Sequence, residues 1–287
     1  GKRFRPVLAL AVAKLIEEPE AHFLPFACAL EFLHTASLIH DDLPALDNDA
    51  LRRGRPSCHR VYGEGTALLA GDSLIARAFL VIAQTSQLSV GEKAILTEAL
   101  AWAFNELCDG QVLDIEAEAG FKDFENASPP QVTSLLSLDF SVDFGLELAG
   151  LESADDRSTL LLLEHRHRQK TGALIRAAAV GPLAARDWPK LKPQEYRAIE
   201  RYSDLLGLLF QLTDDLLDVE GTTAAIGKPV GSDERRQLPT FASLLGVERT
   251  RRFSQAIHQQ ALLALQPFGK QAWFLSELAS RILNRTH

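Results

Sequence analysis

The sequence predicts an all-α protein, and three features of the chain support this prediction. Apolar residues recur every three or four positions through most of its length, which is the spacing of one face of a helix. Alternating patterns typical of strands are nearly absent, and breaks rich in proline or glycine separate the periodic segments. A chain of 287 residues is also long enough for one large helical domain, spanning 1–287, with a sizeable core.

The periodic segments predict about eight to ten helices joined by short loops. Pro6 is expected at the first position of the first helix, where a missing N–H does no harm. The second helix should end before Pro44, which blocks its continuation. The clearest helical segments are 7–18, 26–40, 66–84, 92–118, 196–218 and a run from about 247. The expected breaks are Pro19, 52–56, 128–130, Pro182, Pro189 and 221–231.

Composition excludes several classes of protein. A net charge of -8 argues against nucleic acid as the main partner, because such sites need clustered Lys and Arg. The three cysteines, Cys28, Cys58 and Cys108, are far apart and form no CxxC pair, so neither a disulfide framework nor a zinc site is predicted. A reducing cytoplasm is the expected compartment, and a plastid stroma would suit the same composition. No uncharged run reaches 18 residues, so neither a membrane span nor a signal peptide is expected.

Two aspartate clusters stand at the ends of apolar helical segments. The first contains Asp41, Asp42 and Asp47, with Asp49 just beyond. Crowded carboxylates repel one another and cost helix stability, so a cation should compensate them. One such cluster could be an ordinary solvated helix end, but two are better explained by a metal.

The second cluster contains Asp214, Asp215 and Asp218, of which Asp214 and Asp218 share a helix face. Carboxylate oxygens suit Mg²⁺, which proteins typically hold with one or two carboxylates plus substrate phosphates. The sequence therefore predicts a site for magnesium and a phosphorylated substrate.

Basic residues flank both clusters, as phosphate binding requires. Each of them alone could be an ordinary surface charge. His34 lies seven residues before Asp41, on the same helix face, although a lone histidine is often only a core residue. The flanking cations are Lys2, Arg3, Arg5, Arg52, Arg53, Lys170 and Lys228.

Five motifs together resemble the short-chain trans-isoprenyl diphosphate synthase family. HTASLIHDDLPALDNDALRRGRPSCH is similar to its first aspartate-rich motif, and QLTDDLLDVEG followed by GKPVGSD is similar to its second. GKRFRP, GQVLDIEAE and KTGALIRAA also match family signatures in the family's order, over residues 1 to about 246. The resemblance implies a helical bundle around a deep central cavity, the isoprenoid synthase fold, and a homodimer.

The resemblance also implies residue roles. Asp41, Asp47 and Asp214 match ligands of three Mg²⁺ ions around the allylic diphosphate, Asp42 and Asp218 match residues that support them, and Asp215 completes the second cluster. Arg52, Lys170 and Lys228 match contacts to that diphosphate. Lys2, Arg5, His34 and Arg53 match the isopentenyl diphosphate pocket. Thr171 and Gln211 match polar groups that face the carbocation. Together with Lys170, these two residues form the predicted catalytic set.

Two segments depart from the family pattern. Leu238 stands where the family usually has a lysine, and Arg235 or Arg236 could substitute for it. The segment at about 120–160 is longer than in compact family members and suggests an extra helical hairpin.

Product length is expected to depend on Ala36, five residues before Asp41, where farnesyl-producing relatives commonly carry an aromatic residue. Ala36 and Ser37 should leave the cavity floor open, with Leu33 one turn deeper as the next floor. The prediction is geranylgeranyl diphosphate as the main product, with farnesyl diphosphate as the alternative. Ala36 could instead merely allow close helix packing. A class I terpene cyclase and a non-catalytic regulatory subunit are less favoured, because both aspartate clusters and the isopentenyl pocket are present.

Overall fold

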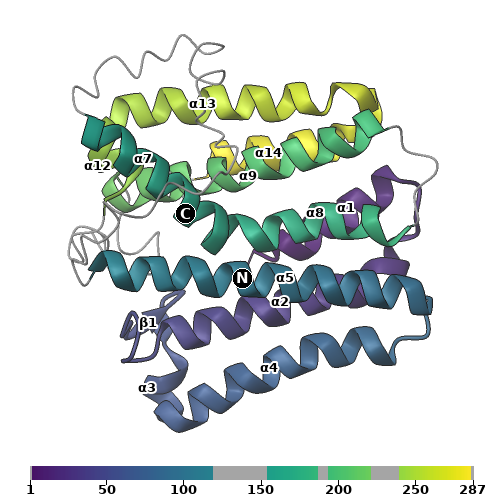
Figure 1. Ribbon diagram of the computed structural model, residues 1–287, viewed down its shortest axis with the longest axis horizontal. Helices are drawn as coiled ribbons and strands as arrows, with labels where there is room; N and C mark the ends of the chain where they lie inside the picture. The colour runs from purple at the N-terminus through teal and green to yellow at the C-terminus, as the bar shows by residue number, and fades with distance from the viewer. Residues whose placement is uncertain (1, 119–153, 187–192, 221–238, 286–287) are drawn as a thin grey trace.

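The computed structural model describes residues 2–118, 154–186, 193–220 and 239–285, and most of these residues are helical. The predicted all-α class is confirmed, since the described residues contain only one short two-stranded hairpin besides helices and loops. Figure 1 shows the long helices lying side by side along the longest axis of the molecule.

The elements follow one another in two groups. The N-terminal group contains α1 (Phe4–Leu15), α2 (Glu20–Asp41), β1 (Leu51–Arg52), β2 (Arg55–Pro56), α3 (Cys58–Tyr62), α4 (Glu64–Gln84) and α5 (Val90–Glu118). The second group contains α7 (Ala154–His167), the π-helical turn η2 (Arg168–Gly172), α8 (Ala173–Ala185), α9 (Pro193–Glu220), α12 (Phe241–Leu245), α13 (Val247–Ala264), the 3₁₀ helix η3 (Gln266–Ala272) and α14 (Trp273–Leu283).

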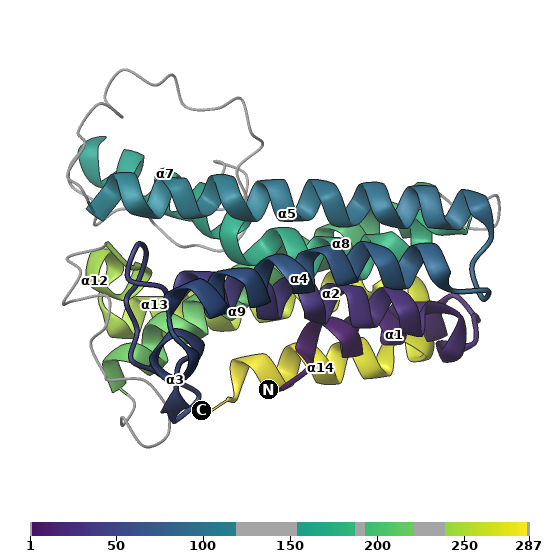
Figure 2. The same cartoon turned by 90° about the horizontal axis from the view of Figure 1, so that it is seen from below.

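Helix α8 occupies the middle of the bundle and contacts α1, α5 and α9. Figure 1 shows α4 and α13 at opposite sides of this arrangement, and the view from below in Figure 2 shows α5 on one side of it and α14 on the other. The sequence of α8 explains its central place, because alanines and glycine let neighbouring helices approach closely. A side chain at Gly181 would meet the ring of Phe26 on α2 at 2.5 Å. The close contact between α8 and α2 therefore requires glycine there.

The positions of two prolines correct the sequence prediction. Helix α1 begins at Phe4, so Pro6 is its third residue rather than its first. Proline is still tolerated there because the N–H groups of the first turn have no partner within the helix. Pro182 lies inside α8 and does not separate two helices. The prediction from Pro44 is confirmed, since α2 ends at Asp41.

Most of the buried apolar side chains of the described residues form one continuous cluster that extends from α1 to α14. Tyr202 of α9 is fully buried within it, and its hydroxyl donates a hydrogen bond to the Leu275 carbonyl oxygen of α14 at 2.7 Å. This bond satisfies the buried hydroxyl and fixes α14 against α9.

Helices α2 and α4 are each long and apolar enough to cross a membrane, judged by length and composition alone. Helix α2 is a core helix, with half of its most apolar window buried inside the molecule. In α4 only 22% of that window is buried, and Asp72 and Arg77 interrupt it. Helix α4 therefore has an exposed apolar face, and its length and composition do not establish a membrane span.

Candidate active site

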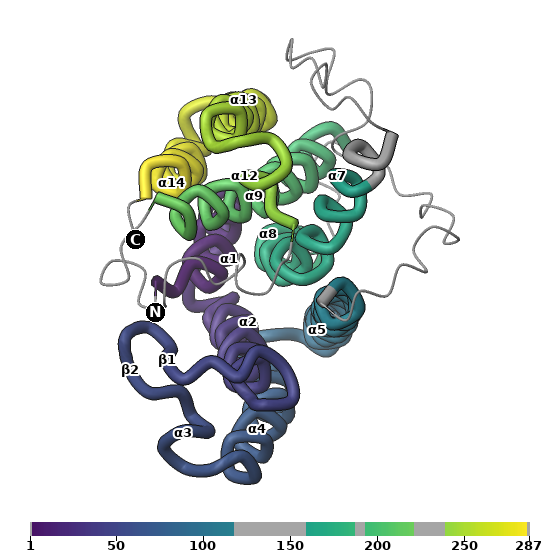
Figure 3. The backbone as a smooth tube through the Cα atoms, turned by 90° about the vertical axis from the view of Figure 1, so that its left-hand side faces the viewer, coloured from purple at the N-terminus to yellow at the C-terminus, as the bar shows by residue number. Residues whose placement is uncertain are grey.

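Three long helices, α2, α5 and α9, run in the same direction and bring their C-terminal parts to one end of the bundle (Figure 1). Figure 3 looks onto that end, where the β1–β2 hairpin and α12 also lie. The aspartates of α2 and α9 and the Lys170 turn meet here, although they are far apart in the sequence.

The first aspartate cluster is built by the end of α2 and the turn that follows. The carbonyl oxygen of Asp41 accepts a hydrogen bond from the Asp47 N–H at 2.8 Å, which turns the chain back beside the helix. Asp42 is buried, and its Oδ1 accepts from Arg52 Nε at 2.8 Å. Arg52 Nη2 also reaches Asp49 Oδ2 at 3.2 Å. The guanidinium of Arg52 therefore compensates two carboxylates and ties the hairpin to α2.

The hairpin presents Arg53 through an unusual backbone conformation. Arg53 and Gly54 form its two-residue turn, and both have positive φ, 54° and 73°. Two positive φ values are typical of the type I′ turn that fits the twist of a hairpin. A left-handed conformation is uncommon for a residue other than glycine, and such strain concentrates at functional sites. The side chain of Arg53 is exposed beside the first aspartate cluster.

The second cluster lies in the last turns of α9. Asp214 is about half exposed, and its Oδ1 lies 2.8 Å from Arg285 Nη2. Asp218 follows one turn later and is partly buried. Asp215 points inward, where its two oxygens accept from Gln211 Nε2 at 2.8 Å and from a backbone N–H of α12 at 2.7 Å. Metal binding by Asp215 stays a prediction, and it would require these bonds to be exchanged.

Lys170 lies in the π-helical turn η2, a kind of turn that is frequent at functional sites. The backbone of Lys170 packs directly on Gly110 of α5, where an added side chain would lie 2.5 Å from the Lys170 nitrogen. The ammonium group forms an ion pair with Asp114 of α5. Burial alone would lower the pKa of Lys170, but Asp114, Asp41 and Asp47 raise it above its ordinary value. Lys170 is therefore a charged ammonium group beside the first aspartate cluster.

Thr171 and Gln211, the two residues predicted to face the carbocation, lie next to each other. Thr171 Oγ1 donates to Gln211 Oε1 at 3.3 Å. Because the Gln211 amide nitrogen donates to Asp215, its oxygen faces Thr171. The buried carboxylate of Asp215 thus fixes the orientation of the amide.

Of the four residues predicted to bind isopentenyl diphosphate, Arg5, His34 and Arg53 lie close enough to affect one another's charge. Burial, together with the nearby guanidinium groups of Arg5 and Arg53, lowers the pKa of His34 to about 2. Burial likewise lowers the pKa of Arg5 to about 10. The pKa of Lys2 is lowered by burial and by the nearby Arg285. The group therefore combines cations with an imidazole that is neutral at physiological pH.

The three residues predicted to control product length all face inward. Ala36 and Leu33 have no exposed surface, and Ser37 is buried. The Ser37 hydroxyl donates to the His34 carbonyl oxygen at 3.0 Å, so it is satisfied within α2. A larger side chain at Ala36 would therefore have to occupy the interior of the protein.

Some predicted features lie outside the described residues. These are Lys228, Leu238 and its neighbours Arg235 and Arg236, and most of the predicted hairpin at about 120–160.

The structure adds three residues that sequence reasoning did not assign to the site: Asp114, Arg166 and Arg285. Asp114 belongs to the GQVLDIEAE motif, which was a usable signal. Arg166 contacts Asp114 from α7, and Arg285 follows α14 and contacts Asp214. No sequence pattern marks either arginine, because each meets its partner only through the fold.

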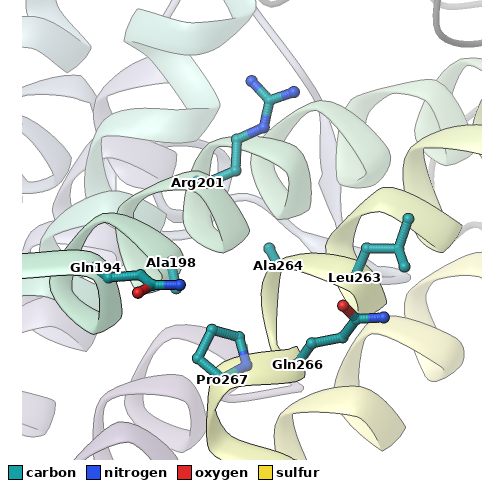
Figure 4. Close-up of a pocket in the computed structure, with 7 residues that line it drawn as sticks. All are labelled: Gln194, Ala198, Arg201, Leu263, Ala264, Gln266 and Pro267. Carbon is teal, nitrogen blue, oxygen red and sulfur yellow. The ribbon is translucent and has the colours of Figure 1, made fainter.

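A separate pocket lies far along α9 from the aspartates, where α13 meets η3 (Figure 4). It is lined by Gln194, Ala198, Arg201, Leu263, Gln266 and Pro267. None of the predicted site residues lines this pocket, so it has no part in the predicted chemistry.

The two aspartate clusters lie at the same end of the bundle, on the facing helices α2 and α9. Their carboxylate oxygens are the kind of ligand that a hard divalent cation prefers. Within the described ranges, no three acidic, histidine or cysteine side chains converge closely enough to hold a metal unaided. That arrangement fits Mg²⁺, which commonly takes only one or two protein carboxylates and completes its coordination with phosphate and water.

Comparison with known proteins decides the family. Residues 1–263 match the family model described as polyprenyl synthetase. The chain belongs to this family. A geranylgeranyl diphosphate synthase from Cyanophora paradoxa is 36% identical over 291 residues, which cover 100% of this chain and 84% of the relative. A probable farnesyl diphosphate synthase from Bradyrhizobium diazoefficiens is also 36% identical, over 98% of this chain and 74% of the relative.

The structure of a geranyltransferase from Helicobacter pylori, complexed with magnesium and isoprenyl diphosphate, superposes with a TM-score of 0.70. It is 31% identical and covers 99% of this chain and 83% of its own. The polyprenyl synthetase described here thus has the all-α isoprenoid synthase fold. Its predicted membership of the short-chain trans-isoprenyl diphosphate synthases is confirmed, and it is a trans-prenyltransferase.

Proposed function

We propose that this prenyltransferase condenses isopentenyl diphosphate head-to-tail with dimethylallyl, geranyl and farnesyl diphosphates and releases mainly geranylgeranyl diphosphate. The observation that carries the proposal is the convergence of the first aspartate cluster with Lys170 and Asp114 at one end of the bundle. The choice of product depends on Ala36, which is small and completely buried. Relatives of equal identity are named for the twenty-carbon and the fifteen-carbon product, so farnesyl diphosphate is the alternative.

We propose three Mg²⁺ ions with substrate bound. Asp41, Asp47 and Asp214 would hold them, with support from Asp42 and Asp218. When bound, Mg²⁺ stabilises the negative charge that grows on the departing diphosphate. The Helicobacter geranyltransferase, which was crystallised with magnesium and isoprenyl diphosphate, supports this proposal by likeness.

The protein's own groups would do the remaining work. Arg52, Lys170 and Lys228 would hold the allylic diphosphate, and their fixed charges would favour cleavage of the carbon–oxygen bond. The allylic cation left behind would be quenched by water, so the site must keep water out. Thr171 and Gln211 would direct oxygen atoms toward that cation while the isopentenyl double bond attacks. The proton lost afterwards would pass to the departing diphosphate.

Arg53→Ala is expected to weaken binding of isopentenyl diphosphate more than binding of the allylic substrate, because Arg53 and His34 lie on the isopentenyl side in the proposal. Loss of a charged hydrogen-bonding contact should cost about 1.5–3 kcal/mol. His34→Ala should cost less, since its imidazole is neutral at physiological pH. Steady-state kinetics with each substrate varied in turn would measure both KM values.

Arg55→Ala is the matched control, because Arg55 is an exposed arginine on the same hairpin with no proposed contact. Its two KM values should stay within about twofold of wild type. Equal increases in both KM values of the Arg53 variant would contradict the division into two pockets.

We also propose that the protein is a homodimer in which α4 contributes to the interface. Its exposed face carries a stripe of apolar side chains at helical spacing, Leu69, Ala76, Leu80 and Ala83, with the small Ser73 between them. Leu69 is 67% exposed, and contiguous apolar surface of this kind typically marks a protein contact. A second copy of the same face would cover it, as the twofold symmetry of most homo-oligomers requires.

Leu69→Glu should therefore convert the dimer to a monomer, because a charge would have to be buried in the interface. Light scattering coupled to size-exclusion chromatography would measure the mass. Leu263→Glu is the control, since Leu263 is exposed on the distant helix α13. A Leu69→Glu protein that remains dimeric would remove α4 from the proposed interface.

The reaction itself is tested by incubating the protein with Mg²⁺, isopentenyl diphosphate and each of the three allylic primers in separate assays. Mass spectrometry of the products should give twenty-carbon diphosphate from every primer. A cyclised hydrocarbon, or no product at all, would refute the proposal. We place the enzyme in the cytoplasm, which suits three cysteines that form no disulfide.

A further inference from the structure

One carboxylate in the site is shared by two cations. Asp114 of α5 has only a small exposed surface, and its Oδ2 forms an ion pair with Lys170 of η2. Its Oδ1 lies 2.9 Å from Arg166 Nε of α7. The three charges therefore form a buried triad of one carboxylate and two cations, beside the first aspartate cluster.

The two cations differ in how firmly they are held. Arg166 is buried, with its side chain 8% exposed, and its Nη2 donates to the Pro239 carbonyl oxygen at 3.1 Å. Arg166 is thus fixed on both sides, by Asp114 and by the segment that leads into α12. Lys170 is more exposed, at 24%, and the carboxylates of Asp41 and Asp47 also act on its charge. Lys170 is therefore the cation on which the first aspartate cluster acts, whereas Arg166 is held between Asp114 and Pro239.

Movement of the Lys170 ammonium group from Asp114 to a bound diphosphate would have an electrostatic cost. If Asp114 had no other partner, the move would leave a buried carboxylate without a counter-charge, which is strongly unfavourable. The allylic diphosphate would have to supply that free energy from its own binding. A second cation on the same carboxylate removes most of the penalty.

We propose that Arg166 is a positioning residue that remains on Asp114 as its counter-ion, so that Lys170 can transfer to the allylic diphosphate. The inference rests on the proposed contact of Lys170 with that substrate. Lys170 is then free to exchange between Asp114 in the unliganded protein and the diphosphate in the complex. Arg166 itself does not touch the substrate.

The test is a double-mutant cycle measured by steady-state kinetics in the full chain. Arg166→Gln should raise KM for the allylic substrate about tenfold and change KM for isopentenyl diphosphate much less, because Lys170 is then the only cation that pairs with Asp114 among the described residues. Adding Asp114→Asn should return the allylic KM to within about threefold of wild type, since no bare carboxylate is left. Arg166→Lys keeps the charge and should remain near wild type.

The cycle separates this role from a purely structural one. The contact between Arg166 and the Pro239 carbonyl is lost in both the single and the double variant, so only relief of the charge on Asp114 can restore the KM. Arg176→Gln is the control, because Arg176 is an ion-paired arginine of α8 whose partners are Asp204 and Glu200. Thermal unfolding would confirm that each variant is folded.

Two results would overturn the proposal: a wild-type allylic KM in Arg166→Gln, or a double variant as impaired as the single one. The proposed contact of Lys170 with the allylic diphosphate, on which this inference rests, is checked independently with Lys170→Ala. If that variant left the allylic KM unchanged, the proposed contact of Lys170 would fail, whatever the Arg166 variants showed.

Discussion

Asp41→Ala and Asp214→Ala are each expected to lower kcat by several orders of magnitude while KM rises much less. The two residues stand on different helices, at the end of α2 and in the last turns of α9. Each is proposed to hold Mg²⁺ against a diphosphate whose negative charge is largest in the transition state. Removal of a ligand therefore weakens an interaction made mainly at that stage, which lowers kcat.

Activity should also disappear when a chelator removes Mg²⁺ and return when Mg²⁺ is added in excess. Glu277→Ala is a suitable control, because this carboxylate lies on the surface of α14 and forms an ion pair with Arg281 of the same helix. Its kcat should match that of wild type. If Asp41→Ala or Asp214→Ala kept more than about a tenth of wild-type kcat, the assignment of three metal ions would be wrong.

Ala36→Tyr is expected to change the main product from twenty carbons to fifteen. Five residues of helix place Ala36 about 7.5 Å from Asp41 along α2, and one isoprene unit is roughly as long as one helical turn of about 5 Å. Ala36 is fully buried, so a tyrosine side chain could not escape to solvent. It would therefore occupy the space that the last isoprene unit of the longer product needs.

The products of this variant would be measured by mass spectrometry with dimethylallyl diphosphate as primer. Ala36→Gly is the control, since it adds no bulk at the same position and should keep the twenty-carbon product. Thermal unfolding would exclude a general loss of structure. An unchanged product spectrum in a folded Ala36→Tyr protein would show that Ala36 only allows close helix packing.

The fold was predictable from the sequence because its helices are long and their apolar spacing is regular. The end of α2 followed from Pro44, and both aspartate clusters could be recognised from local spacing. Pro182 misled the prediction because the tight packing of α8 against its neighbours outweighs the hydrogen bond that proline removes. Tertiary contacts thus decided what local sequence left open.

The parts of the site that could not be predicted are contacts between distant segments. Arg285 reaches Asp214 across 71 positions of the chain, and Arg166 reaches Asp114 across 52. Neither separation along the chain produces a recognisable sequence pattern, because it depends on the lengths of the loops and on how the helices pack. The π-helical turn around Lys170 is likewise invisible in a pattern of apolar residues, since it continues between two α-helices without a break.

The common direction of α2, α5 and α9 has a consequence for the order in which ligands arrive. Each helix carries a macrodipole equivalent to roughly half a negative charge at its C-terminal end, and here three such ends lie at the end of the bundle that holds the aspartates of α2 and α9. A bare diphosphate meets repulsion from these dipoles as well as from the carboxylates. A magnesium–diphosphate complex carries less negative charge and is repelled less. The concentration of free Mg²⁺ in the compartment should therefore govern how readily the allylic substrate enters.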